Sequence, residues 1–300
     1  RRTENATVAS RDGFDRANAT TFEWDGETAR PTVTFRYNPN ETTTRTGPEA
    51  ADGRYTFVDA GEWALLPAFR TRTVWTAPRG EPTRVERRLR TAGPGVAGER
   101  LVYLGPARTV SRTANGQRFR LVVPDAASLR ESPTAVLGAL TNASASLDIG
   151  DRDRTVMAVA APTGRVEWGV RGLAYGDSEF WVRDFEPLNT PDSVWLHEYV
   201  HTRQDFATTR ETRWLTEGTA QYYAALLALD GNRTDFEAVR RELAIGEREP
   251  YGDVVLGDPA TWTANANYRK GALAAGRIDV SLRAATNRSG TLEDAIRRLN

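Results

Sequence analysis

The chain has 300 residues, no net formal charge and an apolar fraction of 39%, which is enough for one large domain or two modest ones with buried cores. Zero net charge predicts no electrostatic attraction to nucleic acid or anionic membranes, and no apolar run approaches the roughly 18 residues of a membrane span. The absence of cysteine excludes disulfide bonds, thiolate metal sites and a cysteine nucleophile.

Short alternating or β-branched segments dominate the first part of the chain. Strands are predicted at residues 20–24, 32–37, 54–58 and 101–105. Turn clusters such as NPN and GPEAADG separate them. This pattern predicts a sandwich-like, β-rich N-terminal domain covering residues 1–115.

The second part, residues 116–300, mixes strands with helices. Ser132 and Pro133 predict the start of a helix that runs to residue 146. Thr190, followed by Pro191, predicts the start of another, and Thr234 with Glu237 predicts a capping box. Strands are predicted at 119–123, 155–160, 165–170 and 179–182, and further helices at 214–229, 268–285 and 292–299. This order predicts an α+β catalytic domain.

Both histidines of the chain lie in one short segment, WLHEYVHTRQ, at His197 and His201. Residues four apart share one face of a helix, so the two imidazoles can bind one metal ion. Glu198 lies about 100° around the helix from His197, within reach of a water molecule on that ion. The spacing is typical of two zinc ligands and a general base. The alternative, two helix-face histidines without a ligand role, is disfavoured because the chain has no other histidine.

A hydrolytic zinc site needs a third protein ligand, which in a chain without cysteine or further histidine must be Asp or Glu. Glu217, in the segment WLTEGTAQYY, is the main candidate because it lies in the first turns of the next predicted helix, which can pack against the first, and Gly218 beside it allows close backbone approach. Asp205 competes for this role but fits better as an acceptor for a histidine N–H. A solvated or capping glutamate is the other alternative for Glu217.

The two motifs together, HEYVH and WLTEGTA, resemble those of the gluzincin metallopeptidases, among which aminopeptidase N and the glycyl aminopeptidases are the most similar. The segments YRKGALAAGRIDVSLR and SGTLEDAIRRL are similar to the glycyl aminopeptidases. The resemblance covers about residues 100–300 and implies a thermolysin-like catalytic domain, a mixed sheet plus a helical lobe, behind the β-rich domain. It also implies one Zn²⁺ per chain held by His197, His201 and Glu217, with Glu198 as general base and Tyr268 stabilising the oxyanion.

Tyr268 also fits this role by its chemistry, because a phenol can donate a hydrogen bond to a developing negative charge. Its alternative is a core or interface tyrosine at a helix end. Tyr199, Tyr222 and Tyr223 are chemical rivals, which we expect to point away from the metal or to pack in the core. Lys270, the only lysine, marks the resemblance without defining a role.

Glu167 is the candidate substrate-binding residue. Aminopeptidase N carries a Gly-Ala-Met-Glu-Asn strand before its HExxH motif, and the glutamate of that strand holds the substrate amine. The segment GRVEWG places Glu167 at the corresponding distance before His197, but it lacks the Asn. An ordinary edge-strand glutamate is the alternative.

Six N-x-S/T sequons predict an N-glycosylated protein outside the cytoplasm, secreted or at the cell surface; a Thr-rich surface with Asn in its turns is the alternative. The sequons lie at Asn5, Asn18, Asn40, Asn142, Asn232 and Asn287. The chain begins without methionine or a signal segment, so we expect any anchor to lie outside these residues.

The predicted function is that of a zinc-dependent metallopeptidase that cleaves peptide or protein substrates as an aminopeptidase. A zinc endopeptidase and a non-catalytic cell-surface binding protein on a peptidase scaffold are the alternatives. No nucleic-acid partner and no membrane span are expected, and the sequence predicts no particular oligomeric state.

Overall fold

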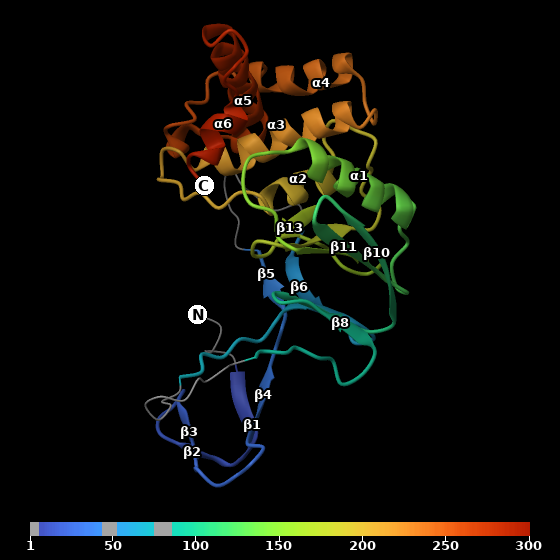
Figure 1. Cartoon of the computed structure of the whole chain (residues 1–300), viewed down its shortest axis with the longest axis vertical. Helices are drawn as coiled ribbons and strands as arrows, with labels where there is room; N and C mark the ends of the chain where they lie inside the picture. Colours follow the sequence, from blue (N-terminus) through green and yellow to red (C-terminus); the bar gives the residue numbers. More distant parts are fainter. Residues whose placement is uncertain (1–5, 44–52, 75–85) are drawn as a thin grey trace. The chain divides into compact units, whose positions relative to one another are not determined.

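The computed structural model describes residues 6–43, 53–74 and 86–300 (Figure 1). The chain divides into two compact units, Arg1–Asn40 and Glu41–Asn300. The boundary predicted between residues 115 and 116 falls inside the larger unit, in the turn between two paired strands. The assignment of an N-terminal and a catalytic domain at that boundary stays a prediction.

The smaller unit consists of two antiparallel strand pairs. In one pair β1 (Ala6–Asp12) lies beside β4 (Thr32–Tyr37), and in the other β2 (Phe14–Arg16) lies beside β3 (Phe22–Trp24). Exposed and half-buried residues alternate along β4, which confirms the strand predicted from its alternating pattern. The rings of Phe22 and Phe35 meet edge to face at 6.2 Å, so this unit is held by a thin apolar contact.

The larger unit is built around a mixed five-stranded sheet in the order β10–β11–β12–β14–β13. The three central strands are parallel, and the two edge strands run antiparallel to their neighbours. The strands are β10 (Ala107–Ala114), β11 (Gln117–Pro124), β12 (Thr155–Ala161), β13 (Gly172–Ala174) and β14 (Glu179–Arg183).

Both faces of the central strands are buried. Along β12, Val156, Ala158 and Ala160 join the core shared with the helices, whereas Met157 and Val159 face a second core on the other side. This explains why the sequence of β12 is continuously apolar instead of alternating. Mixed sheets combined with helices make the unit α+β, as predicted.

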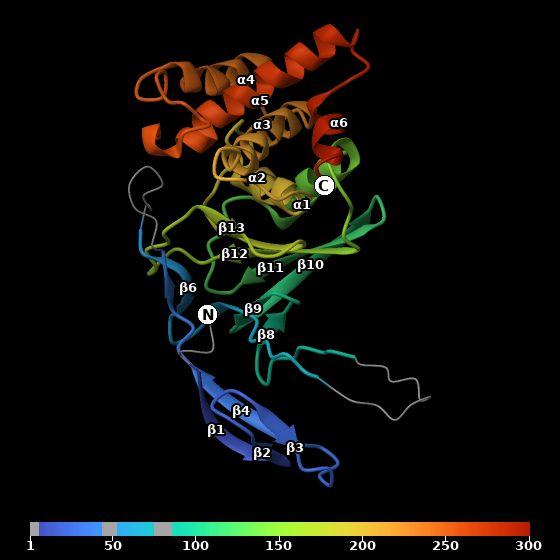
Figure 2. The ribbon, with the colours of Figure 1, turned by 90° about the vertical axis from the view of Figure 1, so that its left-hand side faces the viewer.

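A second five-stranded sheet, in the order β5–β6–β7–β9–β8, covers the face opposite the helices (Figure 2). All its neighbouring strands are antiparallel. They are β5 (Glu41–Thr42), β6 (Tyr55–Asp59), β7 (Ala64–Pro67), β8 (Gly95–Ala97) and β9 (Leu101–Leu104).

Six α-helices and two short 3₁₀ segments complete the described part of the larger unit. Ser132 accepts the Ala135 N–H at the start of α1, and Gly231 ends α3, both as predicted. No helix in the described part of the chain is long and apolar enough to cross a membrane. The helices are α1 (Pro133–Ser146), α2 (Val194–His201), α3 (Trp214–Asp230), α4 (Phe236–Leu243), α5 (Ala266–Ala285) and α6 (Leu292–Arg297), with η3 (Ala244–Glu247) and η4 (Pro259–Thr261).

Two predicted helix starts are wrong. The Thr190 hydroxyl accepts the Asp192 N–H within a local turn, and α2 begins only at Val194. Asp235, not Thr234, caps α4 by accepting the Ala238 N–H. In the first case the predicted residue closes a turn before the helix, and in the second the next polar residue supplies the cap, a one-residue difference that the sequence pattern did not resolve.

The strand predicted at 165–170 is also wrong. Only Trp168 in this segment makes an isolated bridge, to Tyr55. The indole N–H of Trp168 donates to the Pro162 carbonyl at 2.8 Å, and the ring packs in the core beneath the second sheet. The buried Trp168 side chain and the backbone hydrogen bonds to Tyr55 together hold the segment as a loop.

Helices α3 and α5 touch through two glycines. A methyl group added to Gly218 would lie 2.7 Å from the carbonyl carbon of Gly271, and one added to Gly271 would lie 2.9 Å from the Cα of Gly218. Because these neighbours are backbone atoms, a side chain at either position would push the helices apart. The crossing brings the first turn of α5 next to the first turn of α3.

We expect Gly218→Ala to lower the free energy of unfolding by about 1–3 kcal/mol, because overpacking at the crossing outweighs the gain in helix propensity. The matched control is Gly138→Ala in α1, where the nearest atoms are the ends of arginine side chains at 3.6 and 4.0 Å. That control should gain about 0.5–1 kcal/mol. Urea unfolding measures both, and equal stability of the two variants would contradict the close crossing.

Candidate metal centre

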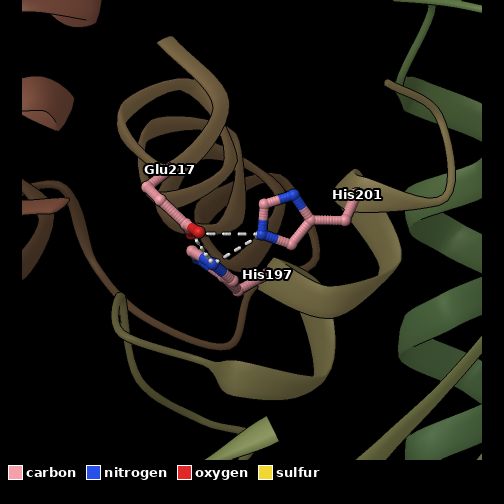
Figure 3. Close-up of side chains that lie close together, drawn as sticks. All are labelled: His197, His201 and Glu217. Carbon is pink, nitrogen blue, oxygen red and sulfur yellow. Dashed lines mark hydrogen bonds and ion pairs between the residues drawn. The ribbon is translucent and has the colours of Figure 1, made fainter. Parts of the chain in front are cut away.

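Three predicted side chains converge on one point (Figure 3). The Nε2 atoms of His197 and His201 lie 3.0 Å apart. The Oε2 atom of Glu217 lies 3.2 Å from each of these nitrogens. The three atoms form a nearly equilateral triangle inside the larger unit.

Local geometry and helix packing together produce this triangle. His197 and His201 project from the same face of α2, which ends at His201. The chain then turns and starts α3, whose first turn carries Glu217 and which packs against α2. Asp205 follows the end of α2, is exposed and takes no part in the cluster.

The other ring nitrogen of each histidine faces a glutamine amide. Nδ1 of His197 lies 3.1 Å from Oε1 of Gln221, and Nδ1 of His201 lies 2.7 Å from Oε1 of Gln204. Asp205, predicted as such an acceptor, instead donates its backbone N–H to Asn300. The spacing could have indicated both glutamines, because Gln221 is one turn after Glu217 and Gln204 nearly one turn after His201.

The amide groups of the glutamines are oriented by their own partners. The Gln221 NH₂ group donates to Asp192 Oδ1 at 2.8 Å. The Gln204 NH₂ group donates to the Thr216 carbonyl at 3.0 Å and to the Thr219 hydroxyl. Each amide therefore turns its oxygen towards a histidine and accepts the Nδ1 proton. In the neutral rings Nε2 then carries a lone pair.

Three hydrogen-bond acceptors therefore face one another without a donor between them, which requires a cation or a proton. Burial alone would lower the pKa of His201, but the Glu217 carboxylate raises it to about 9. Burial would likewise raise the pKa of Glu217, yet the two imidazoles hold it well below its usual range. The carboxylate and the imidazoles thus shift each other's pKa in the directions that favour a positive charge between them.

A divalent metal ion fits the triangle. Two imidazole nitrogens and one carboxylate oxygen are a ligand set for zinc, with bonds of about 2.0–2.2 Å. Tetrahedral bonds of that length separate ligand atoms by about 3.3 Å, close to the observed 3.0 and 3.2 Å. His197, His201 and Glu217 are therefore the residues that could hold such an ion.

Glu198 is buried beside this group. Its Oε2 accepts the backbone N–H of Ala174, in the edge strand β13, at 2.7 Å. A methyl group on Gly172 would lie 2.7 Å from the Glu198 Oε1 and 2.8 Å from its Cγ, so only glycine leaves room for this carboxylate. Burial raises the pKa of Glu198 above its ordinary value, although the neighbouring imidazoles oppose the shift.

Tyr268 lies in the first turn of α5, and its ring stacks on that of His197 with centroids 5.6 Å apart. Its chemical rivals are engaged elsewhere or buried: Tyr199 bonds to Gln117, Tyr222 bonds to Asp279, and Tyr223 lies in the helical core. The Nζ atom of Lys270 donates to the Gly252 carbonyl at 2.5 Å and so attaches α5 to the preceding loop.

Glu167 does not lie with the other predicted residues. Its side chain is exposed on the loop before β13, and its backbone carbonyl accepts the N–H groups of Arg54 and Tyr55. It does not line the cavity at the metal centre. The structure thus brings together five of the six predicted site residues.

A cavity of about 430 Å³ opens onto these side chains. One wall of the cavity is β13. Another wall is formed by three charged side chains, in which Asp192 Oδ2 lies 2.6 Å from Arg171 NH1 and 3.6 Å from Arg269 NH2. Asp192, Glu198 and Glu217 are the carboxylates among its lining residues. The arrangement can bind a metal ion and place a buried carboxylate beside it.

No protein-family model matches the chain, and no curated protein matches it. Among solved structures, an aminopeptidase N family protein from Idiomarina loihiensis is similar with 16% sequence identity and a TM-score of 0.47. The match covers 69% of this chain and 46% of that one, so the chain spans less than half of its length.

We expect the purified chain to bind one divalent metal ion and to lose it in His197→Ala or Glu217→Ala, because two remaining ligands hold zinc weakly. Asp205→Ala is the matched control and should keep the ion, since its side chain lies outside the cluster. Metal analysis after dialysis measures the stoichiometry. Full occupancy in Glu217→Ala would contradict this ligand set.

Proposed function

We propose that the chain is a zinc-dependent metallopeptidase with a thermolysin-like catalytic unit. The observation that carries this proposal is the convergence of His197, His201 and Glu217 beside the buried Glu198. Zinc suits the mixed nitrogen and oxygen ligands, and three protein ligands leave a position open. When bound, the ion supplies Lewis acidity that polarises the scissile carbonyl and activates a water molecule.

Glu198 is the proposed general base. A carboxylate next to the ligand set can take a proton from water and pass it to the leaving amine. Burial raises the pKa of Glu198, which strengthens its carboxylate as a base for the proton of the water molecule. The Ala174 N–H and the space left by Gly172 hold the carboxylate in place.

Tyr268 is the proposed donor to the oxyanion. It lines the cavity and its ring stacks on that of His197, which supports a position beside the substrate for its phenol. A hydroxyl there strengthens its hydrogen bond as negative charge develops on the substrate oxygen. A lower kcat with little change in KM in Tyr268→Phe would support this role.

The edge strand β13 is the proposed binding surface for the substrate backbone. The Arg171 carbonyl and the Tyr175 N–H bond to β14, so Gly172 and Ala174 turn their backbone groups to the open edge. An extended peptide can add to such an edge as a further strand. Because the same edge carries the contact to Glu198, the peptide would lie beside the base.

The cavity favours an endopeptidase over the predicted aminopeptidase. A free α-ammonium bound near the metal needs a carboxylate partner. Glu167, the predicted partner, is outside the lining. Of the carboxylates that do line the cavity, Glu217 and Glu198 have the roles above, and Asp192 is bound by Arg171 and Gln221.

An extracytoplasmic, N-glycosylated protein is also proposed. Asn5 lies outside the described residues, but the other five sequon asparagines are all exposed, as an acceptor site requires. They are Asn18, Asn40, Asn142, Asn232 and Asn287. Intact-mass analysis of the protein from its native source tests this, and a mass equal to that of the bare chain would contradict it.

We expect Glu198→Gln to keep its zinc and its fold but to lose turnover by about 10²- to 10⁴-fold, because an amide cannot take a proton from water. Zinc content and circular dichroism are the controls, and cleavage of a peptide library is the measurement. Unchanged activity in the variant would contradict the peptidase mechanism. Zinc binding by the parent without cleavage of any peptide would favour the non-catalytic binding protein.

We expect N-acetylated peptides and peptides with a free N-terminus to be cleaved at similar rates, at internal bonds, because the described residues that line the cavity offer no unengaged carboxylate to an ammonium. Mass spectrometry of the products measures both the rates and the bonds cleaved. A strong preference for free N-termini, abolished in Glu167→Ala, would instead support the aminopeptidase.

A further inference from the structure

The two histidine-binding amides are oriented by different kinds of partner. The NH₂ group of Gln204 faces the Thr216 carbonyl, a backbone group that can only accept. Within the described part of the chain, the Gln221 NH₂ group donates to Asp192 Oδ1, 2.8 Å away. The orientation of the Gln221 amide therefore depends on a side chain that does not touch the metal ligands.

Asp192 is itself held firmly. Its Oδ2 lies 2.6 Å from Arg171 NH1 and 3.6 Å from Arg269 NH2, which leaves Oδ1 for Gln221. Although burial opposes the charge, the two guanidinium groups keep the pKa of Asp192 below its ordinary value. An ionised carboxylate is acceptor-only, so it accepts from Gln221 and cannot donate to it.

We propose that Asp192 is a positioning residue of the metal centre, which acts through the amide of Gln221 to decide which ring nitrogen His197 offers to the ion. With the amide oxygen towards His197, the proton sits on Nδ1 and the lone pair on Nε2. If the amide turned over, its NH₂ group would face Nδ1 and favour the proton on Nε2. That proton would point into the ligand triangle and block metal binding by His197.

A purely structural role for Asp192 makes a different prediction. Glu242 also pairs with Arg269, but the described hydrogen bonds show no contact between Glu242 and Gln221. If Asp192 acted only by balancing the arginines, removing either carboxylate would have similar effects. If Asp192 acts through the Gln221 amide, removing the Asp192 carboxylate changes the His197 tautomer and removing the Glu242 carboxylate does not.

The decisive variant is Asp192→Asn, which keeps the shape but offers one oxygen and one NH₂ group. The oxygen of the new amide accepts from the two arginines, so its NH₂ group faces the NH₂ group of Gln221. Because two donors cannot form a hydrogen bond, the Gln221 amide turns over. We expect zinc affinity to fall about 10- to 100-fold, the usual cost of losing a hydrogen-bond partner of a metal ligand. Competition with a fluorescent chelator measures this affinity.

The tautomer can be read directly, because the chain contains only two histidines. In protein labelled with ¹⁵N-histidine, the pH of the metal-free form is raised until the ¹⁵N shifts of both rings are those of neutral imidazole, and the tautomers are read there. We expect the His197 proton on Nδ1 in the parent and on Nε2 in Asp192→Asn. Glu242→Gln is the matched control and should leave the tautomer and the zinc affinity unchanged.

A compensating variant tests the amide orientation itself. Combining Asp192→Asn with Gln221→Glu places an acceptor-only carboxylate between the new NH₂ group and His197 Nδ1, so the Nδ1 proton and the zinc affinity should return. If Asp192→Asn does not fold, Gln221→Met removes the amide and should show the same loss of affinity. Circular dichroism establishes the folding of each variant.

Three outcomes would overturn the proposal: parent-like tautomer and affinity in Asp192→Asn, an equal loss in Glu242→Gln, or no recovery in the double variant. The proposal relies on the proposed function only in taking His197 as a zinc ligand. Because its measurements are a tautomer and a binding constant, a failure to cleave peptides would count against the proposed function and leave this inference standing.

Discussion

Three lone pairs that face one another at hydrogen-bond distance are the constraint on which the rest of the site depends. Two ring nitrogens and a carboxylate oxygen lie 3.0 to 3.2 Å apart, while the opposite nitrogens are already engaged by amide oxygens. Such a group is stable only around a cation or a proton, because each atom is an acceptor. The amides of Gln204 and Gln221 therefore determine the chemistry of the centre as much as the ligands do.

The layered architecture explains why a carboxylate base and a substrate-binding edge fall in the same place. Strands β12 and β14 are covered on both faces, so they form the rigid interior of the larger unit. The neighbouring β13 is the edge, and α2 packs across β13 and β14. Glu198 on α2 thereby reaches the open side of β13. There its carboxylate accepts the Ala174 N–H and occupies the space beside Gly172, which a side chain would fill.

The charged wall of the cavity, formed by Arg171, Asp192 and Arg269, joins three separate parts of the chain beside the metal centre. Arg171 precedes β13, Asp192 precedes α2 and Arg269 lies in α5, and ion pairs join them. Largely buried charges are tolerated only when they are paired and hydrogen-bonded, so these residues fix one another's positions. The close crossing of α3 and α5 at Gly218 and Gly271 adds a steric constraint that places Tyr268 over His197.

The sequence by itself determined the features that depend on local geometry. The spacing of His197 and His201 follows from the helical repeat, and the need for a carboxylate as third ligand follows from the absence of other donors. The buried strands at the centre of the sheet were predictable because their apolar runs are continuous, and α1 and α3 because their capping residues act within one turn.

Only the tertiary structure decided the features that depend on contacts between distant segments. Gln204, not its neighbour Asp205, meets His201, because the turn after α2 points one side chain inwards and the other to solvent. The loop at Glu167 is fixed by the burial of Trp168 and by backbone hydrogen bonds to Arg54 and Tyr55, and it leaves the glutamate outside the cavity. Asp192, in the turn before α2, accepts a hydrogen bond from Gln221 in α3. Local propensities carry no information about such contacts, because their energies depend on which segments the whole fold brings together.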